Sequence, residues 1–132
     1  MACTYLGNNE RMALTVTSRT MGSVQVIDLS GEIDAQSLPP LETKLQELTE
    51  GGFYRIVLDF GEVPFIASAG LGVLMSVIGT IQDNGGDLVI ARSQADVYRT
   101  FDLLDFTTLF KFADSVDAAV AVFGEAVGVQ DR

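Results

Sequence analysis

The residue whose chemistry stands out in this sequence is Ser68, in the stretch FIASAGLGVLMSVIG. Small residues, Ala67, Ala69 and Gly70, surround it, and an apolar run typical of a buried helix follows. A serine at such a point can cap the helix, because its hydroxyl accepts a backbone N–H of the first turn. It can also carry a phosphate, because a helix N-terminus offers free N–H groups and the positive end of the dipole. The two roles are compatible.

Nucleophilic catalysis by Ser68 would need a base, and the sequence offers none of the usual kind. The chain contains no histidine, and its one cysteine is Cys3. Ser–His–Asp and Cys–His systems are thereby excluded, together with most zinc sites and any internal disulfide. The acidic residues are spread over expected helix surfaces and turns, with no spacing that demands a metal. We therefore expect no catalytic residue, no metal site and no cofactor, and a binding module rather than an enzyme.

The pair Gly70 and Gly72 invites comparison with a nucleotide-binding loop. A dinucleotide fingerprint needs a third glycine where Met75 stands. The lysine of a phosphate-binding loop is also missing. The glycines do not predict nucleotide binding.

The charge of the chain limits its partners. Its 132 residues carry 18 acidic and 8 basic side chains, a net charge of −10. No cluster of Lys and Arg is present, so nucleic acid and anionic membranes are disfavoured, and a basic patch on another protein fits better. The sequence shows neither a signal peptide nor an apolar run of about 18–20 residues. We expect a cytoplasmic protein that is a monomer or a weak dimer.

Hydrophobic periodicity predicts a single α/β domain with a mixed central sheet and helices packed on it, in the order ββαβαβαβα. Residues 1–11 are expected to form a flexible leader, 12–127 the domain and 128–132 a C-terminal tail. The predicted strands are 12–20, 23–31, 54–60, 87–91 and 109–114. The predicted helices are capped by Ser37, Ser68, Ser93 and Ser115 or Asp114. Strand residues expected in the core are Val57, Leu58, Leu88, Val89 and Ile90, against a helix over 71–81.

Two motifs in these elements resemble those of the STAS domain family, specifically the stand-alone bacterial anti-sigma factor antagonists. One is Gly31-Glu32-Ile33-Asp34, after the second strand. The other is Phe65-Ile66-Ala67-Ser68-Ala69-Gly70-Leu71-Gly72, at the start of the second helix. Ala67 stands where the family usually has Asp, and Ala69 where it often has Ser or Thr. Ser68 is thus the only hydroxyl in this loop.

The resemblance implies a switch in protein binding. In such proteins the unphosphorylated form binds an anti-sigma factor, often a serine kinase, and so frees the sigma factor. Phosphorylation of the motif serine breaks the complex, and a PP2C-type phosphatase restores it. The serine corresponds to Ser68. The expected partner-binding residues are Glu32, Asp34, Ser37, Ala67, Ser68, Ala69, Gly70 and Leu71, with Leu71 and Asp34 as anchors.

Two alternatives remain open at this point. One is a STAS scaffold module in a signalling assembly that is never phosphorylated. The other is a small-ligand-binding STAS domain that uses the polar turn beside Asp34.

Overall fold

A computed structural model describes residues 14–124 of the chain. The expected leader, Cys3, the first residues of the expected first strand and the C-terminal tail lie outside the described residues. So do residues 125–127 of the last expected helix.

The described chain begins with a β-hairpin. Strands β2 (Thr15–Met21) and β3 (Val24–Ser30) pair antiparallel from Thr15 opposite Ser30 to Met21 opposite Val24. Gly22 opens the two-residue turn between them with φ 64°, a conformation that glycine adopts without steric cost. The predicted hairpin is confirmed.

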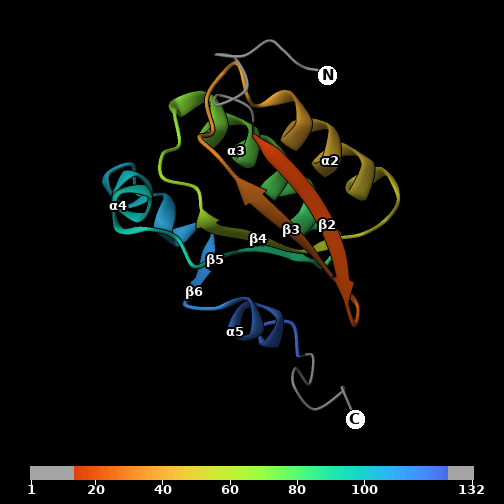
Figure 1. Cartoon of the computed structure of the whole chain (residues 1–132). Helices are drawn as coiled ribbons and strands as arrows, with labels where there is room; N and C mark the ends of the chain where they lie inside the picture. The colour runs from red at the N-terminus through yellow and green to blue at the C-terminus, as the bar shows by residue number, and fades with distance from the viewer. Residues whose placement is uncertain (1–13, 125–132) are drawn as a thin grey trace.

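Helices and strands then alternate, as Figure 1 shows. The elements are α2 (Pro39–Glu50), β4 (Arg55–Glu62), α3 (Ser68–Asp83), β5 (Asp87–Ala91), α4 (Ala95–Leu103), the 3₁₀ helix η1 (Phe106–Thr108), β6 (Lys111–Ala113) and α5 (Val116–Ala121). The five described strands form one sheet in the order β2-β3-β4-β5-β6, and all pairs after the hairpin are parallel. The predicted order of elements is confirmed, and only η1 was not expected.

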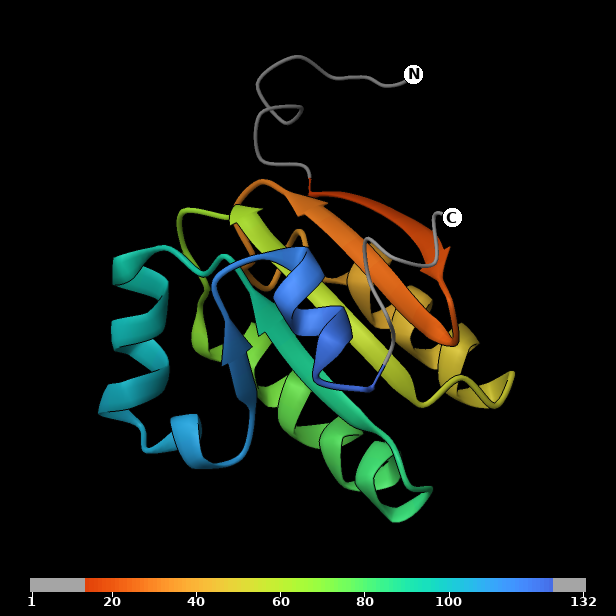
Figure 2. The same ribbon diagram turned by 90° about the horizontal axis from the view of Figure 1, so that it is seen from below.

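The sheet separates two apolar layers. Figure 2 shows α5 on the near face and α2 and α3 on the far face. On the far face, Leu58 and Ile90 of the strands pack with Leu41 of α2 and Leu74 of α3. On the near face, the alternate strand positions Val57 and Val89 pack with Ala119 and Val120 of α5. All the strand residues expected in the core are fully buried.

The predicted caps of α2 and α4 are wrong. Helix α2 has Leu38 at its N-cap, not Ser37. A cap at Ser37 would need the N–H groups of residues 39 and 40, and both are prolines, which have none. Helix α4 has Gln94 at its N-cap, not Ser93. Ser115 caps α5 as predicted, since its hydroxyl accepts the N–H of Ala118 at 3.0 Å.

Candidate functional site

The two sequence motifs meet side by side at the carboxyl ends of β3 and β4. The Ile33 N–H donates to the Phe65 carbonyl at 3.0 Å, and the Ala67 N–H donates to the Ile33 carbonyl at 2.8 Å. Ile33 and Ile66 form an isolated parallel bridge, and both side chains are buried. The motifs, although more than thirty residues apart in sequence, therefore form one continuous structure, because they follow the neighbouring parallel strands β3 and β4.

Ser68 is the first residue of α3 and not its cap. Ala67 occupies the N-cap position with extended backbone (φ −88°, ψ 167°) and no side-chain cap hydrogen bond. The expectation that Ser68 is the N-cap is therefore wrong by one residue. Ser68 is exposed, and its hydroxyl makes no hydrogen bond to any other residue in the range 14–124. The hydroxyl is therefore not held by the helix and faces solvent.

Gly70 lets the first turn of α3 approach the paired motifs. A Cβ at Gly70 would lie 2.6 Å from Cγ2 of Ile33 and 2.9 Å from Cγ1 of Ile66, both closer than packed atoms allow. At Gly72 a Cβ would meet nothing within 4 Å. The two glycines thus differ: Gly70 is required by packing, while Gly72 leaves the surface beside Ser68 open.

Leu71 belongs to the core. Its side chain is 2% exposed and packs in the same cluster as Leu74. The expectation that Leu71 is an interface anchor is therefore wrong, because a partner cannot contact a side chain that the helix buries against the sheet. Gly70 is also buried, so it can offer a partner no side-chain contact.

Asp34 and Ser37 stabilise the turn that follows Ile33, next to the segment that leads to Ser68. The Asp34 carboxylate accepts the N–H groups of Gln36 and Ser37, each at 2.9 Å. The buried Ser37 hydroxyl donates to the Glu32 carbonyl at 2.7 Å and accepts the Asp34 N–H at 2.9 Å. These groups satisfy one another within the turn. Ser37 is therefore occupied in holding the turn, and the turn has few polar groups left for a small ligand.

We call the exposed surface around these segments the Ser68 tip, and define it by Glu32, Asp34, Glu62, Phe65 and Ser68. Glu32, Glu62 and Ser68 are exposed, Asp34 is half-buried, and Phe65 is 49% exposed. The Gly31 N–H donates to the Glu62 carbonyl at 3.0 Å, which brings Glu62 beside the first motif. Sequence reasoning missed Glu62 and Phe65, although Phe65 follows a proline in a loop, where an apolar side chain need not be buried.

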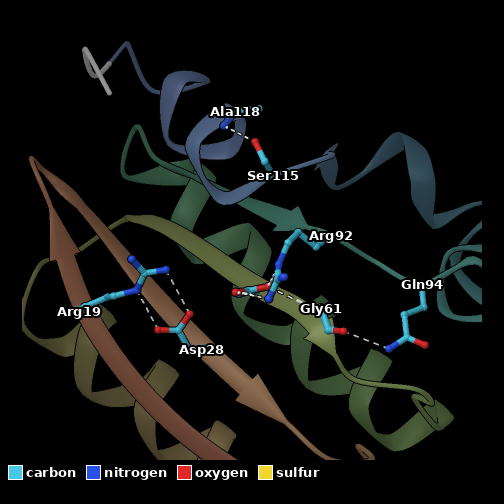
Figure 3. A network of polar contacts seen from close by, with 8 residues as sticks. Arg19, Asp28, Gly61, Arg92, Gln94, Ser115 and Ala118 are labelled. Carbon is cyan, nitrogen blue, oxygen red and sulfur yellow. Dashed lines mark hydrogen bonds and ion pairs between the residues drawn. The ribbon is translucent and has the colours of Figure 1, made fainter. Parts of the chain in front are cut away.

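A polar network fixes the end of β4 just before this tip. Arg92 donates to both carboxylate oxygens of Asp59, from Nε at 2.8 Å and from a terminal nitrogen at 3.0 Å. The Asp59 carboxylate also accepts the Gly61 N–H at 3.0 Å. Figure 3 shows the Arg92 side chain beside Gly61 on the neighbouring strand, and the Gly61 carbonyl accepts a hydrogen bond from Gln94. The next loop leads directly to Ser68.

The Asp59 pKa reflects this network. Burial acts to raise it, but the hydrogen bonds from Arg92 and the Gly61 N–H, with the Arg92 charge, outweigh burial and hold the pKa below its usual value. Arg92 takes a left-handed backbone (φ 58°) that is uncommon outside glycine. The signal in the sequence was an aspartate inside the apolar strand IVLDF. Its partner, 33 residues further on, could not be read from the sequence.

Three further observations concern the described part of the chain. Among residues 14–124, no group of three or more His, Cys, Asp or Glu side chains is placed to hold a metal ion. No helix in that part of the chain is long and apolar enough to cross a membrane. An open pocket is lined by Arg92, Ser93, Tyr98 and Phe112, among others, but none of its lining residues belongs to either motif.

The described chain is thus a five-stranded α/β domain that presents an exposed serine at the first position of α3. The STAS domain family matches residues 15–119, and the chain belongs to this family. One relative is BtrV of Bordetella bronchiseptica, named as a candidate anti-sigma factor antagonist, with 29% identity over 86% of this chain and 98% of its own. Another is the anti-sigma-B factor antagonist of Bacillus subtilis, with 35% identity over 58% of this chain and 70% of its own.

Solved structures show the same fold. The anti-sigma factor antagonist SpoIIAA in its unphosphorylated form has a TM-score of 0.71 at 18% identity, over 85% of this chain and 99% of its own. The phosphorylated form of the Bacillus SpoIIAA has a TM-score of 0.65 at 17% identity, over 82% and 99%. At these identities the likeness concerns the fold alone.

Proposed function

We propose that this chain is an anti-sigma factor antagonist whose binding is switched by phosphorylation of Ser68. The observation that carries the proposal is that a STAS domain presents, at the first position of α3, one exposed serine with a free hydroxyl. The names of its relatives support the antagonist role, and the two forms of SpoIIAA support a phosphorylated state. In this role the chain acts in the cytoplasm as a binding module, and its partners are an anti-sigma factor with serine-kinase activity and a PP2C-type phosphatase.

The phosphoryl transfer would be carried out by the partner. The Ser68 oxygen forms a bond to the γ-phosphorus of ATP, the bond between that phosphorus and the bridging oxygen of ADP breaks, and the hydroxyl proton passes to a base. We assign the base to the kinase, because the Ser68 hydroxyl has no hydrogen-bond partner among residues 14–124. What this chain supplies is access, because Ser68 is exposed and Ala67, Ala69 and Gly72 around it are small. Hydrolysis of the phosphoserine by the phosphatase returns the hydroxyl and releases phosphate.

Phosphorylation should weaken binding without unfolding the chain. A helix N-terminus stabilises an anion by about 0.3–1 kcal/mol, so the fold tolerates the phosphate. In the complex the phosphate would meet a surface shaped for a neutral hydroxyl, and burying an unpaired charge is costly. The switch therefore acts at the interface.

We expect Ser68→Asp to lose affinity for the anti-sigma factor by tenfold or more, or about 1.4 kcal/mol per decade, while its melting temperature stays within a few degrees. Ser68→Ala should still bind and should not be phosphorylated. Calorimetric titration measures the affinity, and mass spectrometry after incubation with the kinase and ATP measures the modification. Ser76→Asp is the matched control, because Ser76 is an exposed serine two turns further along the same helix.

Labelling of Ser68→Ala to the same extent as the parent chain would contradict the assignment of Ser68. Undiminished binding of the anti-sigma factor by Ser68→Asp would contradict the proposed phosphorylation switch. It would favour a scaffold module that is never phosphorylated.

A further inference from the structure

The most unusual side chain of the Ser68 tip is Phe65. Its ring is 49% exposed, although the neighbouring side chain of Ile66 is 3% exposed. The backbone on either side is fixed, because the Phe65 carbonyl accepts the Ile33 N–H at 3.0 Å and the Ala67 N–H donates to the Ile33 carbonyl at 2.8 Å. With Ile33 and Ile66 facing the core, the Phe65 ring is presented to solvent on a backbone that needs no reordering to bind.

The charge around this ring is of one sign. Glu32 and Asp34 adjoin Ile33, whose N–H donates to the Phe65 carbonyl, and Glu62 precedes Phe65 by three residues. No lysine or arginine in the range 14–124 forms an ion pair with any of these three carboxylates. Arg92, whose pKa is raised by Asp59 and more weakly by Glu62, already donates to both oxygens of Asp59. The tip is thus an apolar centre with an acidic rim.

We propose that Phe65 is the anchor by which the Ser68 tip binds its partner, and that the partner surface is an apolar recess bordered by lysine or arginine. This inference rests on the proposed function and adds to it the residue and the chemistry of recognition. Aromatic side chains are enriched at interface centres, and a few buried anchors provide most of the binding energy. A second copy of the chain is disfavoured as the occupant, because it would bring the same acidic rim against this one.

The acidic rim also determines how the phosphate must act. A phosphate on Ser68 adds negative charge, which increases long-range attraction to a basic partner and cannot by itself explain release. The phosphate instead opposes binding because it holds its hydration water. That water lies beside the Phe65 ring, which must lose its own water to enter the recess. Ser68→Asp should therefore raise the dissociation rate, while its association rate should not fall.

The anchor can be tested with a matched pair of exposed phenylalanines. Phe65 is 49% exposed after β4, and Phe53 is 47% exposed before it, at the other end of the strand. The probe is the purified anti-sigma factor encoded in the same genome, in calorimetric titrations with the full chain. We expect Phe65→Ala to weaken binding at least tenfold and Phe53→Ala to leave it unchanged, with both melting temperatures near that of the parent chain.

The rim can be tested by salt dependence. The double variant Glu32→Gln, Glu62→Gln should show a lower association rate at low salt and a smaller change in affinity with salt than the parent chain. Asp83→Asn is the control, because Asp83 is exposed at the far end of α3. If the affinity of the double variant changed with salt as much as that of the parent chain, the proposal that lysine or arginine borders the partner's recess would be overturned.

The outcomes separate this inference from the proposed function. If the parent chain binds the anti-sigma factor and Phe65→Ala binds equally well, the anchor is wrong and the proposed function stands. If the parent chain does not bind at all, both are rejected. If light scattering shows a dimer that Phe65→Ala dissociates, the ring belongs to a contact between copies and the proposal is overturned.

Discussion

At the scale of single residues, the N-cap of α3 is Ala67, and this bears on why the Ser68 hydroxyl has no hydrogen-bond partner among residues 14–124. Ala67 has the backbone of an N-cap but no side-chain acceptor, so no side chain caps the first turn, although the Gly70 N–H donates to the Ala67 carbonyl at 2.9 Å. The STAS families usually have Asp at this position. In this chain, without that carboxylate, the start of α3 has no side-chain cap and the Ser68 hydroxyl has no neighbouring side-chain acceptor at position 67.

Ala67→Asp should stabilise the chain. A capping side chain is worth about 1 kcal/mol relative to alanine, and a carboxylate also interacts favourably with the helix dipole. We expect the melting temperature to rise by a few degrees, measured by circular dichroism. Ala67→Asn separates the two effects, because it caps without charge. A melting temperature below that of the parent chain for both variants would contradict the assignment of Ala67 as the N-cap.

At the scale of elements, the close approach of α3 to the Ile33–Ile66 bridge holds the two motifs together. That approach depends on Gly70 and not on Gly72, although the two glycines look alike in the sequence.

Gly70→Ala should destabilise the chain by about 1–3 kcal/mol, because its Cβ would overlap Ile33 and Ile66 in a packed site. Gly72→Ala should be neutral or stabilising by up to about 1 kcal/mol, since an exposed helical glycine costs backbone entropy. Urea unfolding of the two variants measures the difference. Equal destabilisation by both substitutions would mean that helix propensity, and not contact with the bridge, governs these positions.

Much at this scale could be predicted from the sequence. Alternating apolar residues bounded by glycine turns predict the strands, and the apolar run after Ser68 predicts the buried helix. Both predictions depend only on local periodicity. Helix starts were less predictable: Ser37, Ser68 and Ser93 each lie one residue before or after the true N-cap. The pairing of Asp59 with Arg92 and the burial of Leu71 depend on tertiary contacts, which a single sequence does not contain.

At the scale of the whole molecule, the Asp59–Arg92 pair links stability to pH. The Asp59 pKa is lowered in the folded chain, so the carboxylate stabilises the fold at pH values above about 3.9, the usual value for Asp. That contribution is lost as pH falls through the lower pKa of the folded state.

Asp59→Asn should therefore be less stable than the parent chain at pH 7, and the difference should shrink as pH falls below about 4. Melting temperatures at a series of pH values for both chains measure this. Asp102→Asn is a suitable control, because Asp102 is exposed on α4. A difference that stays constant from pH 7 to pH 3 would show that the Asp59 charge has no part in the effect.

The strand order β2-β3-β4-β5-β6 follows the order of the chain itself. Each strand therefore joins the free edge left by the one before it, and none of the described strands has to enter between two that are already paired. Since synthesis proceeds from the N-terminus at about 5–20 residues per second, the sheet can grow on the ribosome one strand at a time. The paired motifs need only β3, β4 and the start of α3, so they can be assembled before β5 and β6 join the sheet.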